Sequence, residues 1–158
     1  MIPIPLVNNE NKRVCTDCGG KCCKSMPGLC APEDFLPDVK MGVERALLSG
    51  GYALDTWEGN PITDDDCAPG EVFFVRPAVK GARELVDRSW GGECKLLTPM
   101  GCSLAFEKRP EECRHLVPET DVDIRRVKGC RGGGREKREL VIAWLPYQDI
   151  LTQMAEDM

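Results

Sequence analysis

Ten cysteines dominate the chemistry that this sequence offers, and eight of them fall into two groups. The first group comprises Cys15, Cys18, Cys22, Cys23 and Cys30, the second comprises Cys94, Cys102 and Cys113, and Cys67 and Cys130 stand alone. The thiolate is both the nucleophilic and the metal-binding form of this side chain. Chance rarely places four thiols within nine positions, so the spacing indicates a metal or redox site.

The spacing of the first group suits metal binding. Two residues separate Cys15 from Cys18, so the chain can turn back and direct both sulfurs at one ion. Gly19 follows directly and permits a tight turn in which backbone N–H groups point at thiolate sulfur. The glycine pair favours a loop that leads into a helix, from which Cys22 and Cys23 project in different directions. We therefore expect that these two do not both bind the same metal atom.

The second group places its thiols on a hairpin and a short helix. Seven residues separate Cys94 from Cys102, which is the right length for a tight hairpin that brings the two sulfurs close together. Cys113 falls in the first turn of a helix predicted to open at Pro110, where the helix dipole stabilises a thiolate. A single fold must bring the two groups together if they form one site.

Arg109 and Arg114 flank Cys113, and two interpretations of them stay open. A cluster of thiolates accumulates negative charge, and guanidinium groups that donate hydrogen bonds to sulfur reduce the cost of holding it together. The other interpretation is ordinary surface pairing with Glu111 or Glu112, which is common and weak.

The number of cysteines bears on the type of metal centre. One zinc ion or one iron–sulfur cubane takes four protein ligands. The proposed ligands exceed that number: they are Cys15, Cys18, Cys22, Cys23, Cys94, Cys102 and Cys113. Either two centres are present, or one centre is accompanied by further thiols. The adjacent Cys22 and Cys23 favour an iron–sulfur cluster of the 4Fe–4S type over zinc, which remains the alternative. Cys30 and Cys67 are expected to act as small buried apolar side chains.

The remaining sequence predicts a small α+β domain that spans residues 1–158, with its motifs in 15–134. Expected elements are a helix over 32–48, strands over 71–79, 93–97 and 102–106, a turn over 98–101, a short helix from Pro110 that Pro118 ends, and a C-terminal amphipathic helix over 135–156. Residues 82–89 fit a helix or a strand, and 64–66 a solvated turn. Pro146 should kink the last helix, whose apolar stripe is expected to pack on the core rather than on a partner.

Composition and charge exclude several classes of function. The 158 residues are 42% hydrophobic, and 21 basic against 26 acidic side chains give a net charge of −5. No positive field recruits nucleic acid or an anionic membrane, and no apolar run is long enough to cross a bilayer. The N-terminus lacks the features of a signal peptide, so a cytoplasmic protein with reduced thiols is expected. The alternative is a secreted chain whose leader has been removed.

With these motifs in view, the chain resembles the YkgJ-type cysteine-cluster family, described as zinc- or iron-chelating domains. The family pattern opens with C-x2-C-x3-C-C, as at 15–23, and continues with a cysteine, a hairpin, a second cysteine and R-P-x-x-C-R, as at 94–114. The chain departs from the pattern at Leu116-Val117, because the family often has an aromatic residue before the proline that is Pro118 here. It departs again at Arg131, because a later element of the family has proline after the cysteine that resembles Cys130. The resemblance implies a metal-binding cysteine cluster. Some longer relatives are flagellin lysine N-methylases, but we do not expect that activity of this much shorter sequence.

Other candidate sites are weaker. His115, the only histidine, can serve as a ligand or proton carrier beside Cys113, but a histidine without such a role is more common. Gly132–Gly134 lacks the Lys-Ser/Thr of a phosphate-binding loop and is interpreted as a turn. No catalytic residues are identified, so the sequence leaves open whether the protein is an enzyme.

We therefore expect a cytoplasmic iron–sulfur protein that serves electron transfer, cluster delivery or a partner enzyme. A zinc-stabilised protein-interaction module is the alternative. Methyl transfer from S-adenosylmethionine is a third, weaker possibility. A protein partner is expected in the first two cases, and no feature of the sequence identifies it.

Overall fold

The computed structural model describes residues 27–63, 70–82, 84–88, 92–99, 101–121, 126–132 and 135–157. Several predictions fall outside these residues: the positions of Cys15, Cys18, Cys22, Cys23 and Cys67, and the turn over 64–66. The described elements form a small α+β fold of short helices and antiparallel strand pairs, as the sequence predicts. No helix in the described part of the chain is long and apolar enough to cross a membrane.

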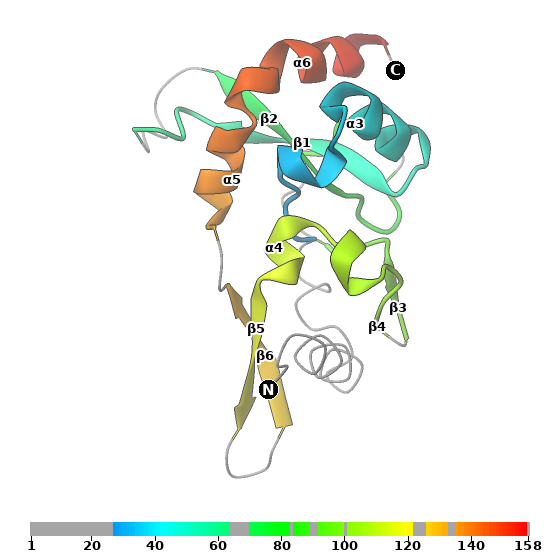
Figure 1. Ribbon diagram of the computed structural model, residues 1–158, viewed down its shortest axis with the longest axis vertical. Helices are drawn as coiled ribbons and strands as arrows, with labels where there is room; N and C mark the ends of the chain where they lie inside the picture. The colour runs from blue at the N-terminus through cyan, green and yellow to red at the C-terminus, as the bar shows by residue number, and fades with distance from the viewer. Residues whose placement is uncertain are drawn as a thin grey trace.

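The longest strand pair is a twisted antiparallel ribbon (Figure 1). Strand β1 (Tyr52–Glu58) pairs with β2 (Glu71–Pro77), with Tyr52 opposite Pro77. The prediction of β2 is confirmed, although the strand ends two residues early, whereas β1 was not predicted. The segment 82–89, whose sequence fits either a helix or a strand, contacts this ribbon through a parallel bridge. Leu54 N–H donates to Leu85 O and Asp87 N–H donates to Leu54 O, both at 2.8 Å.

The prediction of one helix over 32–48 is wrong. A 3-10 turn, η1 (Pro32–Phe35), is followed by a separate helix, α3 (Val39–Leu48). Pro37 lies between them and disfavours a helical conformation at the residue before it, so the first turn cannot continue. Asp38 then caps the new helix by accepting a hydrogen bond of 3.0 Å from Met41 N–H.

The C-terminal segment is helical and is interrupted at the predicted position. It comprises α5 (Lys137–Ala143), the 3-10 turn η3 (Leu145–Tyr147) and α6 (Gln148–Asp157). Pro146 lies inside η3, where its ring and missing N–H prevent a continuous α-helix. The predicted apolar stripe packs on the core of the protein itself: Leu140, Trp144, Leu151 and Met154 are buried.

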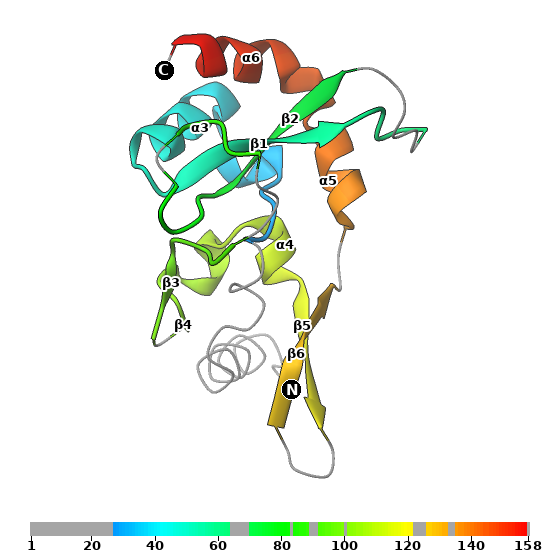
Figure 2. The same ribbon diagram turned by 180° about the vertical axis from the view of Figure 1, so that it is seen from behind.

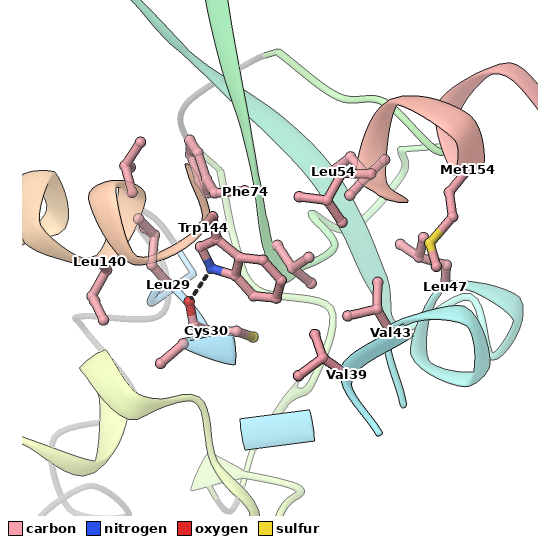
Figure 3. Packing of buried hydrophobic residues seen from close by; sticks show 14 residues of the cluster. Leu29, Cys30, Val39, Val43, Leu47, Leu54, Phe74, Leu140, Trp144 and Met154 are labelled. Atoms are coloured by element: carbon pink, nitrogen blue, oxygen red, sulfur yellow. Dashed lines mark hydrogen bonds between the residues drawn. The ribbon is translucent and has the colours of Figure 1, made fainter. Parts of the chain in front are cut away.

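The hydrophobic core lies between the ribbon and the helices α3, α5 and α6 (Figures 1 and 3). Its largest fully buried apolar side chains include Trp144, Phe74, Leu29, Leu54, Leu140 and Leu151. The indole N–H of Trp144 donates a 2.8 Å hydrogen bond to the carbonyl of Cys30, as Figure 3 shows. This bond satisfies the one polar group of a buried tryptophan.

One buried ion pair stabilises the ribbon. Arg76 of β2 and Asp55 of β1 are both fully buried, and Arg76 Nε lies 2.8 Å from Asp55 Oδ2. Arg76 also donates to the carbonyls of Pro77 and Asp87, so three of its donor groups have partners. Burial raises the pKa of Asp55 more than the hydrogen bonds from Arg76 and Thr56 lower it.

A second set of elements lies apart from this core and is built from very short pieces (Figures 1 and 2). It comprises β3 (Leu97–Thr98), β4 (Gly101–Cys102), the 3-10 turn η2 (Phe106–Lys108), α4 (Glu111–Arg114), β5 (Leu116–Asp121) and β6 (Arg126–Gly132). The predicted turn over 98–101 is confirmed, although both strands are shorter than expected. The prediction that Pro118 ends the short helix is wrong. Helix α4 stops at Arg114, and Pro118 lies inside β5.

Candidate metal centre

The β3–β4 hairpin carries two of the predicted ligands. Cys94 precedes it and forms a bridge with Val79, just beyond β2, while Lys95 N–H donates to Ala78 O at 2.8 Å. Cys102 ends β4 opposite Leu97. The seven-residue spacing predicts this hairpin, and the bridge to Val79 attaches it to the end of the ribbon.

Opposing effects act on the pKa of the Cys94 thiol. The N–H groups of Leu96 and Leu97 hydrogen-bond to this thiol and lower its pKa, whereas burial and the negative charge of Cys102 raise it. Burial is the largest effect, so the pKa of Cys94 is raised overall. Amide donors on sulfur are the interactions that stabilise a thiolate once a cation compensates its burial. The role of Cys94 as a metal ligand stays a prediction.

Cys113 reaches the same part of the molecule from α4. That helix is attached to the segment before η1 through Glu112, whose N–H donates to Leu29 O at 3.1 Å and whose carboxylate accepts from Leu29 N–H at 2.9 Å. The contact is so close that a Cβ at Gly28 would overlap Cys113 Sγ. Only glycine leaves room for the sulfur at this position.

Asp34 holds η1 and α4 together. Its Oδ2 accepts hydrogen bonds from Ala31 N–H at 2.8 Å and from Glu111 N–H at 2.9 Å. Its Oδ1 forms an ion pair of 2.7 Å with Arg114. One carboxylate therefore caps the starts of two elements that are 77 residues apart in sequence. No local pattern in the sequence indicates that Asp34 also binds α4, because those partners are distant along the chain.

The two arginines beside Cys113 have structural partners. Arg114 donates to Asp34 and to the carbonyl of Arg109, and Arg109 is 5% exposed and donates to Leu104 O at 3.2 Å. The neighbouring acids pair elsewhere: Glu111 with Arg135, and Glu112 with Lys137. The positive charge of Arg114 nevertheless lowers the pKa of Cys30, so it does stabilise negative charge on a nearby sulfur.

Cys30 belongs to the hydrophobic core, as expected, and also lies close to the thiols. Its side chain is fully buried, and burial raises its pKa well above the ordinary value. The negative charges of Asp34, Cys113 and Cys94 raise that pKa further. Burial likewise raises the pKa of Tyr52, and the charges of Cys30, Cys102 and Cys94 add to the shift. Tyr52 thus lies near three thiols, which no sequence pattern indicated.

The described thiols gather in one area without completing a metal site. Cys30, Cys94, Cys102 and Cys113 are all free thiols. Within the described ranges, no three cysteine, histidine, aspartate or glutamate side chains are arranged to hold one metal ion. The convergence of 15–23 with Cys94, Cys102 and Cys113 stays a prediction, since that segment lies outside the described residues.

The weaker candidate sites can be located in part. His115 is exposed and ends α4, with its N–H donating to Glu111 O at 3.3 Å. Cys130 lies in β6, where its backbone is opposite Pro118. Gly132 ends β6, and the two glycines after it lie outside the described residues. None of these observations assigns a ligand or proton-carrier role.

Comparisons with known proteins give no match to a protein-family model, to a curated protein or to a solved structure. The resemblance to the cysteine-cluster family therefore rests on the two cysteine motifs alone.

Proposed function

We propose that this protein binds an iron–sulfur cluster of the 4Fe–4S type through thiolates of the two cysteine groups. The ligands are drawn from Cys15, Cys18, Cys22 and Cys23 of the first group and from Cys94, Cys102 and Cys113 of the second. It is a cytoplasmic protein, and it works with a protein partner in electron transfer, in cluster delivery or in support of an enzyme.

The observation that carries the proposal is the surroundings of Cys94. Cys94 is only 5% exposed, and Cys102, opposite Leu97 on the hairpin, lies close enough for its negative charge to raise the Cys94 pKa. Buried neighbouring thiolates repel one another and are costly without a cation. A positive metal centre removes that cost, and thiolate is the ligand that iron–sulfur clusters take.

The remaining residues hold the ligands in place. Glu112 and Asp34 fix α4, and with it Cys113, against 28–34. The hairpin positions Cys94 and Cys102, and Gly28 leaves room for the sulfur of Cys113. When bound, an iron–sulfur cluster supplies one-electron transfer.

The test is elemental analysis of protein purified without oxygen. The proposal expects brown protein with visible charge-transfer absorption and with iron and sulfide in comparable amounts. Cys102→Ser and Cys113→Ser should lose most of the iron, while Cys67→Ser, which removes a thiol outside the ligand set, should keep it. Colourless protein that holds only zinc would contradict the proposal.

A structural zinc ion is the second candidate, and one observation favours it. No residue of the hydrophobic core cluster comes from the described residues of 92–116. Where apolar burial is scarce, a metal–thiolate centre often stabilises the fold instead. The zinc alternative expects one or two zinc ions, no iron and no redox change. A chelator should then unfold this part of the chain, while protein that keeps its fold without metal would contradict it.

A further inference from the structure

A groove is lined by residues of α3 and α6, two helices that lie away from the β3–β4 hairpin and α4 (Figures 1 and 2). Figures 1 and 2 both show these two helices side by side. The groove has a volume of about 600 Å³ and is lined by Lys40, Glu44, Leu48, Asp149, Ile150, Gln153, Met154 and Asp157. None of these residues belongs to the candidate metal centre.

The floor of the groove is apolar. Leu48 ends α3 and is 69% exposed, the largest exposed fraction among the large hydrophobic residues that the structure describes. Ile150 and Met154 of α6 also line the groove, and Met154 is a buried member of the core cluster, so the groove reaches the core at that point. Lys40, Glu44 and Leu48 follow one another at intervals of four residues, so one face of α3 forms the wall. An exposed leucine in a groove lined by other apolar side chains is typical of a binding surface.

The rim of the groove is acidic. Glu44, Asp149 and Asp157 contribute three carboxylates, and Lys40 contributes the only ammonium group among the lining residues. No ion pair between described residues involves Lys40, Glu44 or Asp149, so these charges face solvent. The surplus of negative charge attracts a positive partner and repels an anionic membrane.

The two walls are long enough to contact a short helix. Both are ten-residue helices, each about 15 Å long, which is close to three helical turns. A groove of this kind receives an amphipathic helix through apolar residues spaced three and four apart.

We infer that the α3–α6 groove binds a basic amphipathic helix of a partner protein. The apolar face of that helix covers Leu48, Ile150 and Met154, and its lysine and arginine side chains pair with Glu44, Asp149 and Asp157. This inference does not depend on which metal the cysteines bind, because the groove and the thiols are separate.

The test uses the full chain and a fluorescently labelled synthetic peptide. The probe is an amphipathic helix of leucine and lysine, about 14 residues or four turns long. The control peptide carries glutamate in place of every lysine. We expect saturable binding of the lysine peptide by fluorescence anisotropy, weakened by added salt, and binding at least about tenfold weaker for the glutamate peptide.

Two variants test the floor and the rim separately. Leu48→Ser should weaken binding of the lysine peptide about fivefold through lost apolar contact. Glu44→Gln combined with Asp149→Asn should weaken it about fivefold at low salt and much less at high salt. All three side chains are exposed, so thermal unfolding should be unchanged. The matched controls are Ile62→Ser, at another exposed apolar residue, and Glu58→Gln combined with Glu107→Gln; they should bind like wild type.

Three outcomes would overturn the inference. The first is equal binding of the two peptides, and the second is unchanged binding by both groove variants. The third is a wild-type dimer in sedimentation experiments that Leu48→Ser converts to a monomer, because a second copy of the chain would then cover the groove.

Discussion

Two regions of this molecule are stabilised in different ways. The core region contains η1, the β1–β2 ribbon and helices α3, α5 and α6, and its side chains form one hydrophobic cluster. The thiol region, the described residues of 92–116, contributes nothing to that cluster. Its buried residues include Cys94, Leu97 and Arg109.

The difference lies in the kind of interaction that fixes each region. Apolar burial is non-directional, so the core region tolerates a twisted ribbon and a broken C-terminal helix as long as its apolar stripes meet. The thiol region depends on directed bonds from Asp34 and Glu112 that hold α4 at one position. Directed bonds place sulfur atoms accurately, which a metal site requires, but they contribute less stability than a core does.

The largest effect is expected in the core region. Trp144→Ala should lower the free energy of unfolding by about 4 kcal/mol, because it leaves a cavity and removes the hydrogen bond to Cys30 O. Urea denaturation followed by circular dichroism measures this change. The exposed control Leu36→Ala should stay within about 0.5 kcal/mol of wild type. Equal effects of the two substitutions would show that burial of Trp144 does not stabilise the core region.

A smaller effect is expected where Asp34 joins the two regions. Asp34→Ala removes the acceptor of Ala31 N–H and Glu111 N–H and the ion pair of Arg114, and should cost about 2 kcal/mol. Asp38→Ala removes one cap bond on α3 and should cost about 1 kcal/mol. Hydrogen exchange should accelerate at 111–115 only in the first variant. If both variants accelerate it equally, Asp34 does not fix α4.

A glycine substitution tests the close contact at Cys113. Gly28→Ala places a methyl group on Cys113 Sγ and 3.2 Å from its backbone N, and should cost about 1–2 kcal/mol through overpacking. Gly51→Ala is the control, since its Cβ would meet Leu96 and Ser49 at an ordinary 3.5 Å. Thermal unfolding and metal content give two readouts. Only Gly28→Ala should lower both the unfolding temperature and the metal content. If Gly28→Ala changes neither, the sulfur of Cys113 is not confined by this contact.

The smallest effect concerns pH and the pair Glu111–Arg135. The hydrogen bond from Arg135 lowers the pKa of Glu111 below its ordinary 4.5, so this carboxylate stabilises the folded state at neutral pH and loses that contribution as the pH falls through its folded pKa. Arg135→Gln should therefore cost less than about 1 kcal/mol at pH 7. The difference from wild type should shrink as the pH falls below 4.5. A difference that grows in acid would contradict this assignment.

Much of the secondary structure was predictable because its causes are local. Pro146 interrupts the C-terminal helix, Pro99 and Gly101 belong to the hairpin turn, and the residues after Pro110 start a short helix. Errors arose where a second local cause was overlooked: Pro37 divides the expected long helix. Strand β1 was not predicted because its buried residues do not alternate with exposed ones. Asp55 and Thr56 are both buried next to Leu54.

The sequence by itself determined the grouping of the thiols along the chain, the apolar stripe of the C-terminal helices and the α+β class, since each follows from residue type and spacing. Tertiary structure alone decided that Asp34 caps α4, that Gly28 faces Cys113, that Tyr52 lies near three thiols and that α3 and α6 enclose an acidic groove. These contacts join residues far apart in the chain, and they exist only because burial of the core brings their elements together.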